Sequence, residues 1–406
     1  MQITRKGFLK RLTGAAVAGG LFGRAAAALS IAQESSGATA RQTKIADVQL
    51  WPATIREKVT IKIALGSEDT AENIFLRLRT ADGVVGWGEA SPFSRVTSET
   101  QASALAMGKK LAEMVRGVDP FTIPKIVADM DAFTPGSSSI KAAYEMALWD
   151  ICGKIARQPV VALFGQFRDS FPTDRTIFLG TPSEMAGWAQ ENVRMGFKTV
   201  KVKLGEAPDY DVERIRAVRV AVGKDINLRI DANQGWSPAG AVHALKNMES
   251  CNLESCEQPV PHWDVDGLAY VHEHSPIPIM ADEAVHSPHD AISLVRKDAC
   301  DIINIKLMKS GGILNGMRIA QIAAAANMNC MVGCMSEGTL ALTAAASLVA
   351  SCPNIIYADL DGATFLAIDP VIGGMQIKDG NVILPKKPGL GVEVDPAFLK
   401  TLHPAL

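Results

Sequence analysis

The sequence contains TVKVK (199–203), LRID (228–231), LESCE (253–257), IMAD (279–282) and IINIK (302–306), five apolar runs that each end on a charged residue. These final residues are Lys203, Asp231, Glu257, Asp282 and Lys306, and they recur about every 25 residues, the period of one strand-plus-helix unit. In a closed parallel barrel the carboxyl ends of all strands lie at one face. The sequence therefore predicts one site in which two lysines flank three carboxylates.

The repeat of strand, turn and helix extends on both sides of these runs. It is typical of a parallel sheet with crossover helices, so the predicted fold class is α/β, a (β/α)8-type or modified TIM barrel. Glycine or capping residues mark the helix starts at Asp209, Ser237-Pro238, Ser287-Pro288 and Gly311-Gly312. The strands are expected at 176–179, 199–202, 228–230, 253–256, 279–281, 302–305, 330–332 and 355–358, with a last helix that is short or missing.

The chain before the barrel has the pattern of an α+β capping domain. Alternating strands are expected at 48–51, 59–63 and 74–79, with Asp82-Gly83 as a hairpin turn, followed by helices around 98–115 and 140–155. In the second helix Ala142, Met146, Trp149 and Ile155 are expected to line one face. The predicted domains are 43–170 for the capping domain, 171–374 for a (β/α)7β-like barrel, and 375–406 for a C-terminal segment that returns to the capping domain.

Residues 1–30 have the pattern of an export signal, with a basic start, a short apolar run and small residues after it. The start resembles a twin-arginine signal in which Lys6 replaces the second arginine. The alternative is an amphipathic helix or an anchor, but the apolar run is too short to span a bilayer. Residues 31–42 are expected to form a linker, and the protein to be exported to the periplasm, or cytoplasmic if the signal does not act.

The overall composition excludes several classes of partner. With 41 basic and 43 acidic residues the net charge is -2, which offers no bulk attraction for nucleic acid or an anionic membrane, so a small-molecule substrate is expected. The 7 cysteines are odd in number and lack CxxC spacing, which indicates buried apolar residues and not a disulfide framework or a zinc site. A homo-oligomer is also expected.

Asp231, Glu257 and Asp282 are expected to converge on one divalent cation. Ligand sets made only of oxygen favour Mg²⁺ over zinc or copper. A single carboxylate at a strand end would more simply cap a helix or lie at the surface. Three in register, each behind a buried apolar run, favour a metal site because buried carboxylates need partners.

Lys203 and Lys306 come from strands on opposite sides of these carboxylates. A nearby divalent cation and a second lysine disfavour the ammonium form, which brings a lysine pKa towards the range of a general base. A salt bridge to a neighbouring carboxylate is the alternative, and for Lys306 alone it carries comparable weight. Two bases on opposite faces predict removal and return of a proton α to a carboxylate through an enediolate stabilised by Mg²⁺, the reaction of a racemase or epimerase.

Several motifs together are similar to those of the enolase superfamily, in its muconate-lactonising branch, and most closely to its dipeptide epimerases of the L-Ala-D/L-Glu type. The resemblance implies that Asp231, Glu257 and Asp282 bind one Mg²⁺, that Lys203 and Lys306 are the acid/base pair, and that Lys201 assists near the substrate carboxylate. The motifs are Gly86-Trp87-Gly88-Glu89-Ala90, Lys201-Val202-Lys203, Asp231-Ala232-Asn233-Gln234-Gly235-Trp236, Glu257-Gln258-Pro259-Val260, Ala281-Asp282-Glu283 and Ile305-Lys306-Leu307-Met308-Lys309-Ser310-Gly311-Gly312.

Asp359 and Asp361, after the eighth strand, resemble the family's Asp-x-Asp clamp on the α-ammonium group of a dipeptide. Alternate residues of an extended segment point the same way, so both carboxylates can face one cation. Without this context, Asp-x-Asp before Gly362 would be ordinary turn chemistry. Thr176 on the first strand and the segment 334–337 after the seventh also match family positions near the dipeptide.

The motifs say less about which side chain the second residue of the dipeptide carries. The capping loop at 64–69 lacks the arginine that contacts a substrate glutamate in related epimerases, and Arg95 on the other capping loop is the candidate for that role. L-Ala-L-Glu or L-Ala-D-Glu is the first expected substrate, which would suit peptidoglycan recycling, although an acidic loop would favour a neutral or cationic residue.

Two alternatives remain open. The first is another reaction of the superfamily, that of o-succinylbenzoate synthase or a cycloisomerase, but an acidic clamp at Asp359 and Asp361 would repel a dicarboxylate. The second is a non-catalytic, exported ligand-binding protein. The retention of both lysines argues against this alternative. Acid-sugar dehydratases and mandelate-type racemases place a histidine on the seventh strand, where this chain has Val332-Gly333-Cys334.

Overall fold

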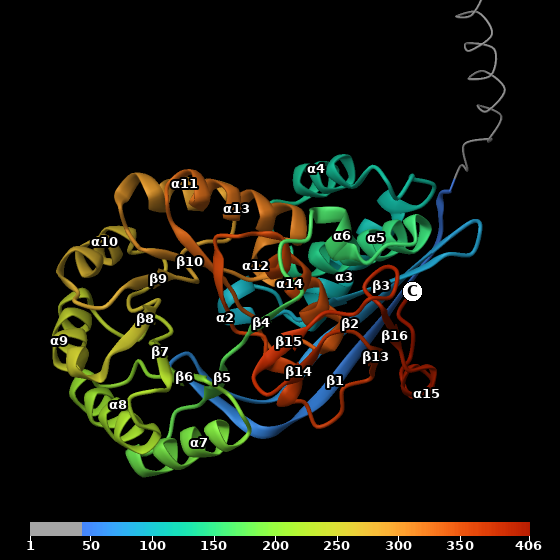
Figure 1. Ribbon diagram of the computed structural model, residues 1–406. Coiled ribbons are helices and arrows are strands. Elements are labelled where there is room, and N and C mark those ends of the chain that lie inside the picture. Colours follow the sequence, from blue (N-terminus) through green and yellow to red (C-terminus); the bar gives the residue numbers. More distant parts are fainter. Residues whose placement is uncertain (1–42) are drawn as a thin grey trace, which may run out of the picture. The chain divides into compact units, whose positions relative to one another are not determined.

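The computed structural model describes residues 43–406, which form one unit (Figure 1). The predicted export signal (1–30) and linker (31–42) lie outside the described residues, so export stays a prediction. Among the described helices, none has both the length and the apolar character needed to cross a bilayer.

An antiparallel sheet begins the described chain, with the strands β1 (Ile45–Ile63), β2 (Gly66–Thr80) and β3 (Val85–Ala90) in that order. The prediction of separate strands at 48–51 and 59–63 is wrong, because β1 runs through both with a register shift between Arg56 and Ile61. Strand β2 pairs with β1 on both sides of this irregularity, which keeps β1 continuous. The turn at Asp82-Gly83 is confirmed, with the main-chain N of Gly83 3.0 Å from the O of Thr80.

Helices follow this sheet and cover it. The helix predicted at 98–115 begins at Gln101 because the Thr100 side chain accepts a hydrogen bond from the N of Ser103 and so caps it. The helix predicted near 140–155 is buried along most of its length and not on one face only, because it packs between β3 and a later helix of the barrel. The helices are α2 (Ser94–Thr97), α3 (Gln101–Val115), α4 (Ile123–Phe133), α5 (Ser138–Ala156) and α6 (Val160–Phe164).

Close packing of β3 against α5 depends on Gly88. A Cβ atom at Gly88 would lie 1.9 Å from the main-chain O of Ala143 on α5, so one of the two backbones would have to move. We expect Gly88→Ala to lower the free energy of unfolding by about 1–3 kcal/mol, as measured by chemical denaturation. Gly187→Ala, where no neighbouring atom lies within 4 Å, is the control, and an equal result for both variants would contradict this packing argument.

Eight parallel strands form the second sheet, and their order in the sheet is their order in the sequence. The predicted (β/α)8-type fold is therefore confirmed, with strand ends that differ from the prediction by at most two residues. The strands are β5 (Arg175–Ile177), β6 (Thr199–Lys203), β7 (Asn227–Asp231), β8 (Leu253–Glu257), β9 (Ile279–Ala281), β10 (Ile302–Ile305), β11 (Asn329–Val332) and β12 (Ile355–Ala358).

Helices connect these strands and lie outside their curve, as α7 to α11 show in Figure 1. Ser237 and Ser287 cap α9 and α11 as predicted, each by accepting a main-chain hydrogen bond. Asp209 is not a cap, because α8 already begins at Pro208. The helices are α7 (Pro182–Arg194), α8 (Pro208–Val222), α9 (Pro238–Met248), η1 (Glu249–Cys251), α10 (Val265–His274), α11 (Pro288–Lys297), α12 (Leu307–Ser310), α13 (Ile313–Ala325) and α14 (Thr339–Ser351).

The first and last strands of the barrel meet through single hydrogen bonds and not through a ladder. The main-chain N of Asp174 donates to the O of Ala358 at 3.3 Å, and the N of Leu360 donates to Oγ1 of Thr173 at 3.0 Å. After β12 only the short η2 (Gly362–Thr364) follows, which confirms the prediction of a short or missing last helix.

The C-terminal segment contacts both the barrel and the capping sheet. Strands β14 (Gln376–Lys378) and β15 (Asn381–Ile383) join β4 (Ser170–Pro172), which precedes the barrel. Strands β13 (Val371–Gly373) and β16 (Val392–Val394) pair with each other, before α15 (Pro396–Leu399). From β16, the Glu393 carboxylate accepts a hydrogen bond from Nε1 of Trp87 on β3 at 2.7 Å.

Candidate functional site

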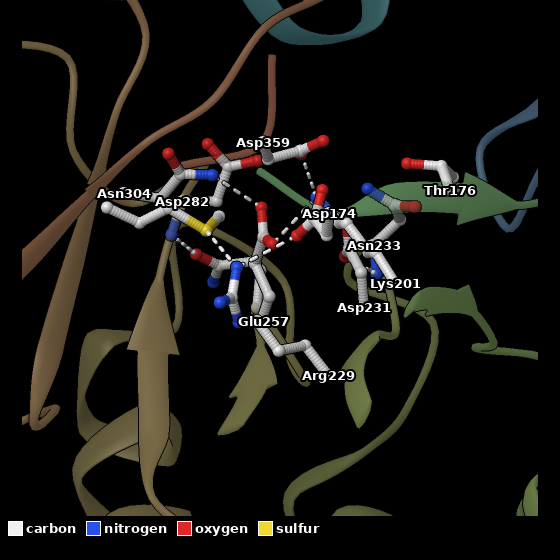
Figure 2. Close-up of polar contacts among 12 residues, drawn as sticks. Asp174, Thr176, Lys201, Arg229, Asp231, Asn233, Glu257, Asp282, Asn304 and Asp359 are labelled. Carbon is white, nitrogen blue, oxygen red and sulfur yellow. Dashed lines mark hydrogen bonds and ion pairs between the residues drawn. The ribbon is translucent and has the colours of Figure 1, made fainter. Parts of the chain in front are cut away.

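The structure brings together all five residues that the strand pattern singled out. Lys203, Asp231 and Glu257 are the last residues of β6, β7 and β8, while Asp282 and Lys306 directly follow β9 and β10. Lys203 pairs with Asp231, and Asp231 with Glu257, in the register of neighbouring strands. Figure 2 shows Asp231, Glu257 and Asp282 at the ends of these strands.

Asp231, Glu257 and Asp282 form a compact set of carboxylates. One oxygen from each lies within 4.8 Å of the others, and none of the three residues is more than 2% exposed. Three buried carboxylates so close together require positive charge between them. A donor set of oxygen atoms alone fits Mg²⁺, because hard cations prefer oxygen ligands.

Two lysines contact this set from its two sides. Nζ of Lys203 lies 2.7 Å from Oδ2 of Asp231, and Nζ of Lys306 lies 2.8 Å from Oδ2 of Asp282. Their strands, β6 and β10, flank the three strands that carry the carboxylates. Lys203 and Lys306 therefore approach the centre of the site from opposite directions.

Lys201 lies deeper than Lys203 on the same strand. Its side chain is 1% exposed, against 11% for Lys203, and its Nζ lies 2.8 Å from Oε2 of Glu257 and 2.7 Å from Oδ2 of Asp359. Burial favours the neutral amine, but Asp359 and Glu257 outweigh it and raise the pKa of Lys201 well above its usual range. Lys201 therefore links the carboxylate set to Asp359 as a permanent ammonium group.

The protonation of the carboxylate set is uneven. Burial disfavours the ionised form of Asp282, but Lys306 and Lys309 hold its pKa well below the usual range. Burial, together with the charge of Asp231, raises the pKa of Glu257 to about 7. The set thus has capacity for further positive charge, which is the behaviour expected of ligands to a divalent cation.

Sequence reasoning missed two residues that hold this set in place. Lys309 contacts both the main-chain O and Oδ1 of Asp282, and Nδ2 of Asn304 donates to Oε1 of Glu257 at 2.7 Å. Both are buried. Asn304 lies two residues before Lys306 on the same face of β10, and Lys309 lies three residues after it on α12, so these spacings were the available signals.

A second set of ion pairs surrounds Arg229, which Figure 2 shows together with Asp174. Arg229, two residues before Asp231 on β7, lies 2.9 Å from Oδ2 of Asp174 and 2.8 Å from Oε2 of Glu254. Asp174 precedes β5, so these ion pairs tie the start of the barrel to its middle. They fix the strand that positions Asp231.

Asp359 and Asp361 lie side by side at the end of β12 and are both buried. Oδ2 of Asp361 accepts a hydrogen bond from the main-chain N of Thr176 at 2.7 Å, whereas Oδ1 of Asp359 has no hydrogen-bond partner among the described residues. Burial and the charge of Asp359 raise the pKa of Asp361 to about 7. A buried oxygen without a donor from the chain can accept a hydrogen bond from a bound molecule.

One cavity of about 110 Å³ lies beside these groups, with walls from the barrel and from the capping sheet, and Asp231, Glu257 and Asp282 are not part of its lining. Of the segment 334–337 predicted to lie near a ligand, residues 334–336 line the cavity and Glu337 does not; no histidine is in the lining. Lys201 is not part of the lining, so its role beside a substrate stays a prediction. The predicted site residues that line the cavity are Lys203, Lys306, Thr176, Asp359 and Asp361. Its apolar lining includes Ile61, Ile63, Phe93, Val96, Phe178 and Phe365.

Arg95 does not line this cavity, although it was the candidate for contacting an acidic substrate side chain. A Cβ atom at Gly66 would lie 1.8 Å from Nη1 of Arg95, so the guanidinium group packs directly against this turn. Glu68 and Glu72 line the cavity in this region. The predicted burial of the cysteines is confirmed except at Cys334, which is partly exposed and lines the cavity.

Comparison with known proteins agrees with this architecture. The family model for the mandelate racemase / muconate lactonizing enzyme N-terminal domain matches residues 45–165, and the enolase C-terminal domain-like model matches residues 184–398. The L-Ala-D/L-Glu epimerase of Clostridium acetobutylicum is 38% identical over 352 residues, which are 86% of this chain and 98% of that protein.

Two further relatives match as closely. The hydrophobic dipeptide epimerase of Enterococcus faecalis is 40% identical over 351 residues, 86% of this chain and 99% of that protein. The crystal structure of the dipeptide epimerase from Cytophaga hutchinsonii, complexed with Mg and the dipeptide D-Ala-L-Val, superposes with a TM-score of 0.87 at 37% identity, covering 89% of this chain and 99% of that one. The chain therefore belongs to the mandelate racemase/muconate lactonizing enzyme family of the enolase superfamily.

Proposed function

We propose that this protein is a Mg²⁺-dependent dipeptide epimerase, an isomerase that inverts the α-carbon of the C-terminal residue of a dipeptide. The observation that carries the proposal is the placement of Lys203 and Lys306, which line one cavity from opposite sides of three carboxylates. The epimerase activities named for the relatives from Clostridium acetobutylicum and Enterococcus faecalis support it.

Asp231, Glu257 and Asp282 are the residues that would hold Mg²⁺. When bound, the cation supplies positive charge that draws electron density from the substrate carboxylate and so acidifies the α-proton. Asn304 and Lys309 keep the Glu257 and Asp282 side chains oriented through their hydrogen bonds. Such supporting contacts matter because ligand orientation controls metal affinity.

Lys203 and Lys306 move the proton. One lysine, as the neutral amine, takes the α-proton from one face of the planar intermediate, and the other, as the ammonium ion, returns a proton to the opposite face. Burial lowers the pKa of Lys306, but Asp282 and Glu257 raise it more strongly. A cation held by these carboxylates would weaken their attraction for the Lys306 ammonium group and so favour its neutral form.

Asp359 and Asp361 would hold the α-ammonium group of the dipeptide. The partnerless Oδ1 of Asp359 provides an acceptor for that group, and both residues line the same cavity as the lysines. This arrangement disfavours the dicarboxylate substrate of an o-succinylbenzoate synthase, because like charges would meet at the clamp. It therefore supports a substrate with a free amino terminus.

The proposal is tested by incubating the Mg²⁺-loaded protein with a library of L,L-dipeptides, including L-Ala-L-Glu, in deuterium oxide. We expect deuterium at the α-carbon of the C-terminal residue together with the appearance of its D epimer, measured by NMR and chiral chromatography. N-acetylated dipeptides are the matched control, with kcat/KM lower by about 10-fold or more because they lack the ammonium group. If no dipeptide exchanges or inverts, the epimerase proposal is wrong.

A further inference from the structure

A second hollow of about 280 Å³ opens beside the reaction cavity. The two share Glu68 and Glu72 on β2, and Pro92 and Phe93 after β3, so a molecule in the first can extend into the second. The hollow belongs to the capping sheet and the loops next to it, and it lies outside the proton-transfer machinery.

The lining of this hollow is strongly acidic. Its charged residues are Glu68, Asp69, Glu72 and Glu99, without a lysine, arginine or histidine. Among the described residues, no basic side chain lies within 4.0 Å of any of these four carboxylates. Asp69 has a neutral partner, Thr60, whose Oγ1 donates to it at 2.5 Å. Arg95 acts on Glu68 and Lys141 on Glu99 only through longer-range electrostatics. The hollow therefore holds more negative charge than the basic groups around it balance.

Glu99 offers this hollow one buried acceptor. It is only 4% exposed, and Oε2 accepts a hydrogen bond from the main-chain N of Ser139 at 2.9 Å. The other oxygen, Oε1, has no hydrogen-bond partner among the described residues. Burial raises the pKa of Glu99, and hydrogen bonding from Ser139 and Ile140 at the start of α5 opposes that rise. A buried carboxylate oxygen of this kind is satisfied by a donor that comes from outside the chain.

The passage between the two spaces is partly apolar. Pro92 and Phe93 line both of them, and Val96 and Ile61 line the reaction cavity nearby. Apolar walls that lead to an acidic end suit a side chain with a hydrocarbon stem and a charged head, because such side chains bury the stem and keep the head among polar groups. Lysine and arginine are the residues with that form.

We propose that the acidic hollow binds the cationic side chain of a lysine or arginine residue in the dipeptide, an inference that rests on the proposed epimerase function. Glu68 and Glu72 form ion pairs with the incoming head group, and Oε1 of Glu99 accepts one of its hydrogen bonds. A glutamate side chain would instead meet four carboxylates. Arg95, which acts on Glu68, lines neither space and so does not contact such a side chain directly.

The first test compares dipeptides that differ only in this charge. The Mg²⁺-loaded protein is assayed with L-Ala-L-Lys and L-Lys-L-Ala, and with the same pairs carrying norleucine, which keeps the hydrocarbon stem but lacks the amine. We expect kcat/KM to be higher for one lysine dipeptide than for its norleucine partner by about 10-fold, and to fall towards the norleucine value in high salt. L-Ala-L-Glu is expected to be poorer than both.

The second test removes the charge from the hollow. Glu68→Gln and Glu72→Gln are each expected to lower kcat/KM for the lysine dipeptide by about 3- to 10-fold, and to lower it less for the norleucine dipeptide, which lacks the amine. The control is Glu113→Gln, which removes an exposed carboxylate on α3 whose partner is Lys110, and it is expected to change neither substrate.

Calorimetric titration of the same dipeptides separates this inference from the epimerase proposal. Tighter binding of the lysine dipeptide without any inversion would reject the epimerase function but support the hollow as the binding site for the cationic side chain. If the unmodified protein binds and turns over norleucine dipeptides as well as lysine dipeptides or better, the proposal that the hollow binds a cationic side chain is wrong. The proposed epimerase function would still stand. A second equivalent of bound Mg²⁺ that disappears in Glu72→Gln would also overturn the proposal for the hollow, by assigning the hollow to a metal.

Discussion

Lys306→Ala and Lys203→Ala are each expected to reduce kcat for epimerisation by about 10²–10⁴-fold, the usual contribution of a positioned acid or base. Each lysine serves one face of the α-carbon, so neither can replace the other. The measurement is the rate of stereochemical inversion of the best dipeptide by the Mg²⁺-loaded variants.

Hydrogen exchange distinguishes this role from a structural one. A variant that keeps one lysine can still exchange the α-proton of the single epimer whose proton faces that lysine, so Lys203→Ala and Lys306→Ala should retain exchange for opposite epimers. Loss of structure would instead abolish both exchanges. Normal inversion by either variant would remove that lysine from the mechanism.

Lys297→Ala is a matched control for these variants. Lys297 is 42% exposed and pairs with Asp266 at the surface, away from the cavity. Its removal should leave inversion and exchange unchanged, because an exposed ion pair contributes little. The contrast then reflects the position of the ammonium group and not the loss of a lysine in general.

Asp282→Asn is expected to weaken Mg²⁺ binding by about 100-fold or more and to reduce inversion at limiting Mg²⁺ by a similar factor. The amide removes the negative charge that Lys306 and Lys309 both contact. Two buried ammonium groups then lose their shared partner, so we also expect the free energy of unfolding to fall by about 3–5 kcal/mol.

Calorimetric titration with Mg²⁺ and thermal unfolding with and without Mg²⁺ measure these two effects. The unmodified protein should gain thermal stability from Mg²⁺, since the cation binds the folded state, and Asp282→Asn should lose most of that gain. Asp266→Asn, which changes a carboxylate that is 84% exposed, is the control. Unchanged Mg²⁺ affinity in Asp282→Asn would exclude Asp282 as a ligand.

The reacting groups could be predicted because they occupy strand ends. A buried strand is an apolar run, so a charge directly after it is conspicuous, and the parallel barrel then places successive strand ends together. This reasoning located Lys203, Asp231, Glu257, Asp282 and Lys306, and the structure places all five in one buried cluster.

The supporting residues could not be found in the same way. Lys309 contacts Asp282 from α12, and its spacing from Lys306 indicates a shared helix face but not which side chain that face contacts. Strand boundaries were also imprecise in the capping sheet, where the residues between Arg56 and Ile61 do not alternate, and the long partner strand keeps β1 intact. Pairing between distant segments decides such cases.

The sequence by itself determined the barrel, the order of base, three carboxylates and base, and the acidic pair Asp359 and Asp361, because each depends on spacing along single strands. Only the tertiary structure decided which capping residues reach the ligand: Arg95 packs against Gly66, while Glu68, Glu72 and Glu99 line the space beside the reaction cavity. These residues come from separate segments of the capping domain. These residues converge because of how the sheet folds over the barrel. No local sequence pattern predicts that convergence.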